Sequence, residues 1–219
     1  MTLFLDSADT SRISDLAKTG AITGVTMNPA LMRPHTDDPL AHLIRVLKAA
    51  GGDRTVMYQP TNAYGTARDE ALRAHETDPR RVVVKIPAVR ASLPLAEELA
   101  RQGVPVALTA ALGPAHMMLA ETVGAKYLIP YVDRSERDIR GCPDLVRELV
   151  RLRTGPVVIV AASLKNLGQA LRARADGADA VSVPAEVIDT ILDHPMSTEA
   201  ALAFDSEYAH RRLPDGTVG

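Results

Sequence analysis

The sequence predicts an α/β protein, a single (β/α)8 TIM barrel with an extra C-terminal helix. Short apolar runs alternate with longer amphipathic segments along the chain, a pattern typical of parallel βαβ units. The apolar runs number eight, which is the strand count of a closed barrel. A length of 219 residues is short for two domains but sufficient for one compact barrel. We therefore expect one domain over residues 1–219.

The expected strands are short apolar runs, most of which end at or beside a polar residue. They are residues 3–6, 22–26, 55–59, 82–86, 104–109, 127–131, 157–162 and 180–183. Helical patterns lie between them, as in residues 93–101, where the apolar residues share one face. Gly103 and Gly177 follow such segments as helix stops. The amphipathic stretch 198–208 is the extra helix, and it can dock on its own barrel or on a neighbouring subunit.

An open, doubly wound sheet is the alternative fold. That fold normally has a glycine-rich phosphate turn after its first strand. Here the first strand runs into Leu5-Asp6-Ser7-Ala8-Asp9, which indicates a helix cap, and no Walker-type sequence occurs. The barrel is therefore favoured.

Composition excludes several classes of protein. Hydrophobic residues make up 46% and charged residues 24%, which is typical of soluble globular chains. A net charge of -2 and the lack of Trp argue against nucleic-acid binding. No apolar run approaches the roughly 20 residues that cross a bilayer, so we expect no membrane partner. The N-terminus has no secretory-signal pattern, and the single Cys142 fits a reducing compartment, so the expected location is the cytoplasm.

The sequence offers no metal centre and no serine-hydrolase motif. The six histidines are scattered without metal-ligand spacing, and one cysteine cannot form a cysteine cluster. No Gly-x-Ser-x-Gly elbow occurs either. We expect no metal.

Lys85 is the most informative residue, because it lies within the apolar run Val82-Val83-Val84-Lys85-Ile86-Pro87. Burial penalises the charged form of a lysine and lowers its pKa from a reference of about 10.4. A neutral amine is the nucleophile that forms a Schiff base with a carbonyl substrate. The alternative interpretation is a lysine at a strand end whose amine reaches solvent at the rim.

Polar residues at the other strand ends are the candidate partners of Lys85, because catalytic groups of such barrels lie at the carboxyl ends of the strands. These residues are Asp6, Thr26, Asn28, Gln59, Thr109, Tyr131, Arg134 and Ser163. Each has a local alternative. Asp6 and Thr109 could cap the helices that follow, Asn28-Pro29 could be a turn, and Tyr131 could be a packing residue.

Chemistry suggests roles for some of these side chains. A carboxylate at Asp6 could bind the carbinolamine hydroxyl or move a proton, and the Tyr131 phenol could pass a proton through water. The Arg134 guanidinium suits a phosphate, and Ser163 with Lys165 adds donors where barrels often bind phosphate. The alternative for Arg134 is an ion pair within the charged segment 133–138.

Several motifs in chain order resemble the transaldolase family, over residues 2 to about 209. They are Leu3-Phe4-Leu5-Asp6-Ser7-Ala8-Asp9, Gly24-Val25-Thr26-Met27-Asn28-Pro29-Ala30-Leu31, Val84-Lys85-Ile86-Pro87, Tyr131-Val132-Asp133-Arg134 and Ala161-Ala162-Ser163. The chain is most similar to the short-chain branch, which contains fructose-6-phosphate aldolases and small transaldolases.

The resemblance implies a class I mechanism without a cofactor, in which Lys85 forms a Schiff base with a ketose and a dihydroxyacetone unit passes to or from an aldehyde. It implies that Asp6, Thr26 and Asn28 bind the donor hydroxyls. It also implies that Gln59, Thr109 and Tyr131 organise the catalytic water and supply the proton, and that Arg134, Ser163 and Lys165 bind the phosphate of the acceptor. The family's oligomers imply a pentamer or decamer in which the last helix reaches a neighbour.

The chain departs from the family pattern at several positions. Transaldolases proper usually have Glu at the position of Gln59 and Phe at that of Tyr131, so the proton-transfer groups resemble those of the aldolases. Met27 replaces the usual Thr, and Ile129 stands where a small residue normally contacts the substrate. These changes suggest a variant sugar substrate, and they motivate a second hypothesis, a catalytically silent barrel that binds a phosphosugar.

Overall fold

The computed structural model describes residues 2–61 and 67–210 and confirms the closed barrel. Eight parallel strands pair in chain order, and the last strand pairs with the first. The open doubly wound sheet is therefore wrong. The strands are β1 (Thr2–Asp6), β2 (Gly24–Thr26), β3 (Thr55–Tyr58), β4 (Val82–Pro87), β5 (Val106–Ala111), β6 (Tyr127–Pro130), β7 (Val158–Ala161) and β8 (Ala180–Val183).

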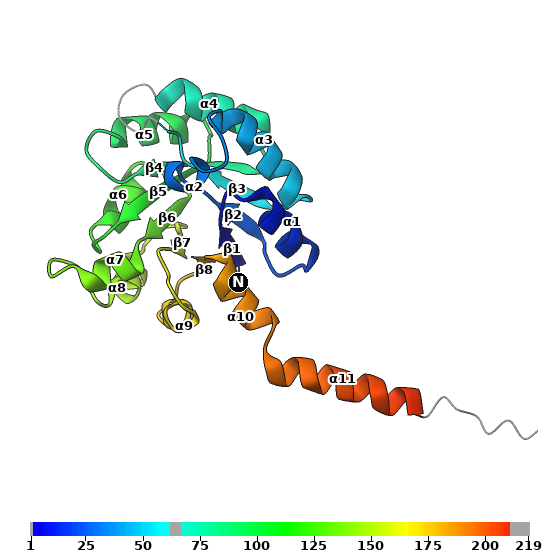
Figure 1. The fold of residues 1–219 in the computed structure, drawn as a ribbon. Coiled ribbons are helices and arrows are strands. Elements are labelled where there is room, and N and C mark those ends of the chain that lie inside the picture. The colour runs from blue at the N-terminus through cyan, green and yellow to red at the C-terminus, as the bar shows by residue number, and fades with distance from the viewer. Residues whose placement is uncertain (1, 62–66, 211–219) are drawn as a thin grey trace, which may run out of the picture.

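Helices surround the barrel and connect successive strands (Figure 1). They are α1 (Thr10–Lys18), α2 (Pro29–Met32), α3 (Pro39–Ala50), α4 (Ala67–Thr77), α5 (Leu93–Arg101), α6 (His116–Thr122), α7 (Val132–Arg137), α8 (Leu145–Leu152), α9 (Leu167–Ala175), α10 (Ala185–Leu192) and α11 (Pro195–His210). Residues 62–66 and 211–219 lie outside the described part of the chain.

The strands bury apolar side chains on both faces, which explains their nearly continuous apolar runs. Outward side chains pack against the helices in one large cluster, whereas inward ones fill the barrel. The interior cluster consists of Phe4, Met57, Val83, Ala107, Ile129, Val160, Ala162 and Ala180. Gly24 is required beside it, because a Cβ there would lie 2.4 Å from the ring of Phe4.

Strand boundaries differ most from the expected ones at β5. This strand begins at Val106 rather than residue 104, because Pro105 has no N–H to donate to a neighbouring strand. It extends to Ala111 through a bulge at Ala110, whose φ is 59°. The bulge lets Thr109 face the barrel interior while Ala111 packs among the outer helices.

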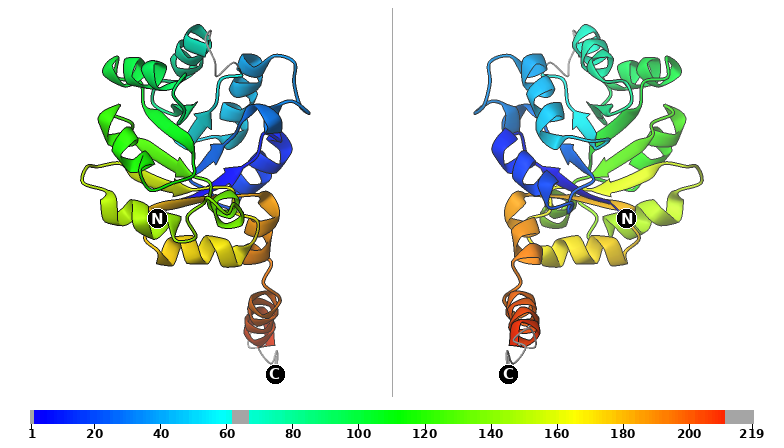
Figure 2. Two further views of the ribbon diagram at one scale, coloured as in Figure 1. Left: turned by 90° about the vertical axis from the view of Figure 1, so that its left-hand side faces the viewer. Right: turned by 90° about the vertical axis from the view of Figure 1, so that its right-hand side faces the viewer.

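The extra C-terminal helix is confirmed and is longer than the stretch 198–208, because it begins at Pro195. In Figures 1 and 2, α11 (orange to red) extends away from the barrel instead of docking on it. Its apolar side chains Met196, Leu202 and Phe204 are 73%, 66% and 69% exposed. Among the described residues, no helix is both long and apolar enough to span a membrane.

Candidate active site

A cavity of about 270 Å³ opens at the carboxyl ends of the strands. Its lining includes eight of the residues that the sequence singled out: Asp6, Thr26, Asn28, Lys85, Tyr131, Arg134, Ser163 and Lys165. These residues come from β1, β2, β4 and the segments after β2, β6 and β7. Three candidates, Gln59, Thr109 and Ile129, are not among the described residues that line the cavity.

Lys85 lies in the middle of β4 and is only 3% exposed, so the interpretation that its amine reaches solvent at the rim is wrong. Its Nζ donates a hydrogen bond to the carbonyl oxygen of Met27 at 3.1 Å, which fixes the direction of the side chain. Burial lowers the pKa of Lys85, and the charge of Asp6 opposes this only in part. The site therefore favours the neutral amine.

This burial predicts a stability effect for Lys85→Met. Between the lowered native pKa and about pH 10.4, Lys85 is protonated in the unfolded chain but neutral in the native protein. Within that window the free energy of unfolding of the wild type falls as pH falls, by about 1.4 kcal/mol per pH unit. Urea unfolding at pH 7 and pH 10 should show Lys85→Met more stable than the wild type at pH 7, with a smaller difference at pH 10. A difference that is independent of pH would contradict it.

Asp6 ends β1 and takes part in a hydrogen-bonded chain of three side chains. Thr26 Oγ1 donates to Asp6 Oδ1 at 2.7 Å and lies 2.6 Å from Ser182 Oγ. Because the Thr26 proton is used on Asp6, Ser182 must donate to Thr26. The helix-cap interpretation of Asp6 is wrong, since Asp9 caps α1 by accepting from the backbone N–H groups of Ser11 and Arg12.

Ser182 was missed by reasoning from the sequence. It is the only polar residue of β8 and is 1% exposed on the barrel interior. The signal was present, because a single hydroxyl within Ala-Val-Ser-Val resembles the polar strand ends of the other strands. Ala30, Leu31 and Ala162 also line the cavity, but their side chains have no feature that sequence reasoning could single out.

Asn28 caps a helix and also lines the cavity. Its Oδ1 accepts hydrogen bonds from the backbone N–H groups of Ala30 and Leu31 and so caps α2. This leaves the amide N–H groups for a ligand. The preceding Met27 is fully buried in the outer cluster, so its side chain replaces the family's usual Thr away from the cavity.

Thr109 and Tyr131 form a pair. Thr109 Oγ1 donates to the Tyr131 hydroxyl at 3.3 Å, so the helix-cap interpretation of Thr109 is wrong. Tyr131 directly follows β6 and forms an isolated bridge with Ala162. Since its oxygen accepts from Thr109, the phenol proton is available to the cavity that Tyr131 lines.

Gln59 follows β3, and its Oε1 is buried without a hydrogen-bond partner among the described residues. An unpaired buried amide oxygen is suited to a bound water or a substrate hydroxyl. Glu70 fixes this segment by accepting from the Tyr58 hydroxyl at 2.5 Å and from the Thr61 backbone N–H at 2.9 Å. Burial and Glu70 raise the pKa of Tyr58, so it remains a donor.

Ile129 does not lie where the sequence suggested. It is 1% exposed within the interior cluster, opposite Thr109 in the β5–β6 register. It therefore packs in the same interior cluster as Tyr131 and Ala162, both of which line the cavity.

One side of the cavity is cationic and is formed by Arg134, Ser163 and Lys165. We call it the anionic subsite, after the charge of the ligand that it suits. The Arg134 guanidinium stacks over the Tyr131 ring at 5.1 Å. The ion-pair interpretation of Arg134 is wrong for the described residues, because the acidic side chains of its segment pair with other arginines. These pairs are Asp133 with Arg137, Asp138 with Arg140 and Glu136 with Arg172. Ser163 adopts a left-handed backbone with φ of 58°, a strained conformation typical of functional sites.

The arrangement combines a buried amine with a lowered pKa, a carboxylate, a phenol and a cationic side in one cavity. Over the described ranges 2–61 and 67–210, no three His, Cys, Asp or Glu residues are grouped as a metal site would need. A buried amine beside a carboxylate is a combination that can support carbonyl chemistry, and the cationic side can attract an anionic substrate.

Comparison with known proteins finds similar sequences over nearly the whole chain. Residues 3–214 match the family model described as transaldolase/fructose-6-phosphate aldolase. A probable transaldolase of Nitrosopumilus maritimus (strain SCM1) is 30% identical over 204 residues, 90% of each chain. One of Caulobacter vibrioides (strain NA1000 / CB15N) is 30% identical over 212 residues, 95% of this chain and 97% of the relative.

Among solved structures, an inosine 5' monophosphate dehydrogenase from Legionella pneumophila superposes with a TM-score of 0.61. The match covers 85% of this chain and 58% of the dehydrogenase, with 15% sequence identity. At that identity the similarity concerns the barrel fold alone.

Proposed function

The chain belongs to the transaldolase/fructose-6-phosphate aldolase family, and on that premise we propose that it transfers or releases a dihydroxyacetone unit of a ketose phosphate through a Schiff base on Lys85. The single observation that supports this most is the buried Lys85 amine, whose pKa is lowered by burial, at the floor of a polar cavity. A binding protein has no need of such an amine.

In the proposed reaction the neutral Lys85 amine attacks the ketose carbonyl, and loss of water gives the imine. Asp6, held by Thr26, receives and returns the protons of the carbinolamine step. Asn28 and Thr26 bind the donor hydroxyls. The hydroxyl beside the scissile carbon–carbon bond then gives its proton to Asp6, and the electrons of the bond move into the protonated imine as the bond breaks. The aldehyde leaves, and the three-carbon enamine stays on Lys85. No cofactor is required by this sequence of steps.

The enamine can react in two ways, and the proposed proton donors influence which reaction occurs. Protonation followed by hydrolysis releases dihydroxyacetone, whereas attack on an aldehyde transfers the unit. Gln59 and Tyr131 favour protonation, because the Tyr131 proton is available and the unpaired Gln59 oxygen can hold a water. We propose that the aldolase reaction is strong in this protein, and that the anionic subsite selects phosphorylated aldehydes.

Reductive trapping tests the proposed function. The protein is incubated with fructose 6-phosphate or dihydroxyacetone and reduced with borohydride. Mass spectrometry should then find a three-carbon adduct on the Lys85 peptide. If Lys85 stays unmodified with several ketose donors while the ligands still raise the thermal midpoint, the protein is a silent phosphosugar-binding barrel instead.

We propose that the protein is a homo-oligomer, a pentamer or decamer, in which α11 docks on a neighbouring subunit. The helix extends from the barrel with Met196, Leu202 and Phe204 exposed, and an isolated helix with such a surface gains stability by burying it. Light scattering after chromatography should give an oligomer for the full chain and a smaller species when residues 195–219 are removed. An oligomer of unchanged size after truncation contradicts this role.

A further inference from the structure

The anionic subsite is assembled from two separate segments of the chain. Arg134 lies on α7, whereas Ser163 and Lys165 lie on the loop between β7 and α9. Binding of one phosphate by both segments requires that their spacing be held before the ligand arrives. A backbone hydrogen bond from Asp133 N–H to the Ser163 carbonyl, 3.3 Å long, is one link between them.

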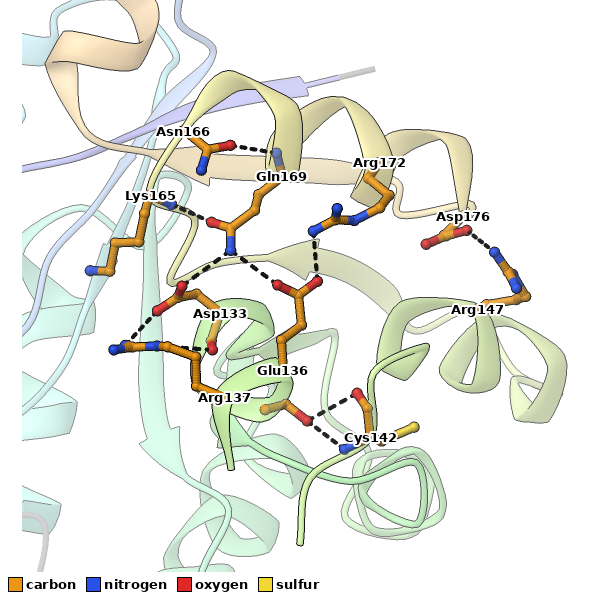
Figure 3. Close-up of polar contacts among 11 residues, drawn as sticks. Asp133, Glu136, Arg137, Cys142, Arg147, Lys165, Asn166, Gln169, Arg172 and Asp176 are labelled. Atoms are coloured by element: carbon orange, nitrogen blue, oxygen red, sulfur yellow. Dashed lines mark hydrogen bonds and ion pairs between the residues drawn. The ribbon is translucent and has the colours of Figure 1, made fainter. Parts of the chain in front are cut away.

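Gln169 provides the side-chain link between these segments. Its Oε1 accepts from the Lys165 backbone N–H at 2.7 Å. Its Nε2 donates to Asp133 Oδ1 at 3.1 Å and to Glu136 Oε2 at 3.0 Å (Figure 3). One amide therefore joins the loop that contains Lys165 to the helix that contains Arg134.

Only an amide satisfies all three contacts. The two carboxylates need a donor with two N–H groups, and the Lys165 N–H needs an acceptor on the same side chain. A glutamate would place a third carboxylate beside Asp133 and Glu136, and a lysine would have no acceptor. Arg137 pairs with Asp133 and Arg172 pairs with Glu136, so both acceptors of Gln169 are themselves held in place.

The charge of Asp133 also supports this role. Burial alone would raise the pKa of Asp133, but the hydrogen bond from Gln169 and the charges of Arg137 and Lys165 together hold it below its usual value. Asp133 thus remains an acceptor for Gln169 throughout the neutral range.

We infer that Gln169 is a positioning residue of the anionic subsite, and that it sets the affinity for the phosphate group by fixing Arg134 relative to Ser163 and Lys165. This inference rests on the proposed function for the identity of the ligand. Gln169 itself lies behind the subsite and is not among the described residues that line the cavity.

The near-isosteric variant Gln169→Glu tests the inference. With dihydroxyacetone as donor, KM for glyceraldehyde 3-phosphate should rise about tenfold, because a mispositioned charged contact loses about one power of ten in binding. The values of kcat and of kcat/KM for phosphate-free glyceraldehyde should stay within about twofold. The double variant Gln169→Glu/Asp133→Asn exchanges amide and carboxylate across the contact and should recover part of the lost affinity.

Two further measurements separate this role from general damage. Arg147→Gln breaks an exposed ion pair with Asp176 at the far end of α9, outside the contacts of Gln169, and should leave KM for the phosphorylated acceptor unchanged. Calorimetric titration with inorganic phosphate measures the subsite without turnover and should show weaker binding by Gln169→Glu. Circular dichroism confirms that each variant is folded.

The outcomes distinguish the inference from the proposed function. A wild type that binds phosphate more tightly than Gln169→Glu, yet turns over no ketose, supports the inference and contradicts the enzyme. Equal phosphate affinity in the two proteins, equal KM increases for both acceptors, or the same effect in Arg147→Gln overturns the inference. A wild type that binds no phosphate overturns it as well.

Discussion

Replacement of Lys85 by Met should lower kcat/KM for ketose cleavage by about 10⁵-fold, the order observed when the nucleophile of a covalent mechanism is removed. Methionine matches the length of the lysine stem and suits a site that is only 3% exposed. Arginine is a less suitable substitution, because it brings a permanent charge into the same buried position. The loss can therefore be assigned to the amine and not to misfolding.

The measurement compares turnover of fructose 6-phosphate with borohydride trapping in the same samples. Lys126→Met is the matched control, because Lys126 precedes β6 at the opposite end of the barrel and stacks on Tyr127 at 5.4 Å. It should retain full activity and the adduct on Lys85. Residual activity of Lys85→Met above about one per cent would mean that another group is the nucleophile.

A smaller variant adds a positive readout to this loss. Lys85→Ala removes the stem and leaves space beside the Met27 carbonyl, to which the amine donates. A small primary amine such as ethylamine could occupy this space and form the imine in place of Lys85. Partial recovery of turnover with amine concentration would show that the missing function is the amine itself.

The barrel could be predicted from the sequence because each strand and each helix has its own pattern of apolar and polar residues. Apolar runs and amphipathic segments alternate eight times, and the strands bury both faces. The bulge at Ala110 could not be predicted, because no glycine marks its positive φ. The orientation of α11 was also left open, since an amphipathic helix can cover any apolar surface.

The part of the candidate site that lies at the strand ends could be predicted from the sequence. Asp6, Lys85 and Tyr131 meet in one cavity because the carboxyl ends of parallel strands share one face of the barrel. The errors concern which of several neighbouring side chains makes a given contact. The helix cap belongs to Asp9 and not Asp6, and the ion pairs beside Arg134 use other arginines, because such pairing depends on side-chain direction.

Ile129 is a further residue whose side-chain direction could not be predicted from the sequence. The resemblance to the transaldolase family implied contact with the substrate, because the family commonly has a small residue beside the substrate at this position. In the barrel it faces inward one layer lower, opposite Thr109. We therefore expect Ile129 to influence specificity through its packing beside Tyr131 and Ala162, which line the cavity.

Tyr131→Phe should separate the two reactions proposed for the enamine. The variant keeps the ring that Arg134 stacks on, at 5.1 Å, and removes only the hydroxyl that accepts from Thr109. Without this phenol the enamine loses its proton donor, so the rate of dihydroxyacetone release should fall by about 10²- to 10³-fold. Imine formation depends on Lys85 and should continue. Quantified release, measured with borohydride trapping of the same samples, checks both statements.

Tyr127→Phe is the matched control, because Tyr127 packs against the same interior cluster as Tyr131 but lies at the start of β6, whereas Tyr131 follows the end of that strand. It should change neither release nor trapping. If Tyr131→Phe also prevents trapping, the hydroxyl acts before the carbon–carbon bond breaks, and its role is in imine formation. If transfer to glyceraldehyde 3-phosphate persists in Tyr131→Phe while release is lost, the enamine survives without a proton donor, and this hydroxyl controls the balance between aldolase and transaldolase chemistry.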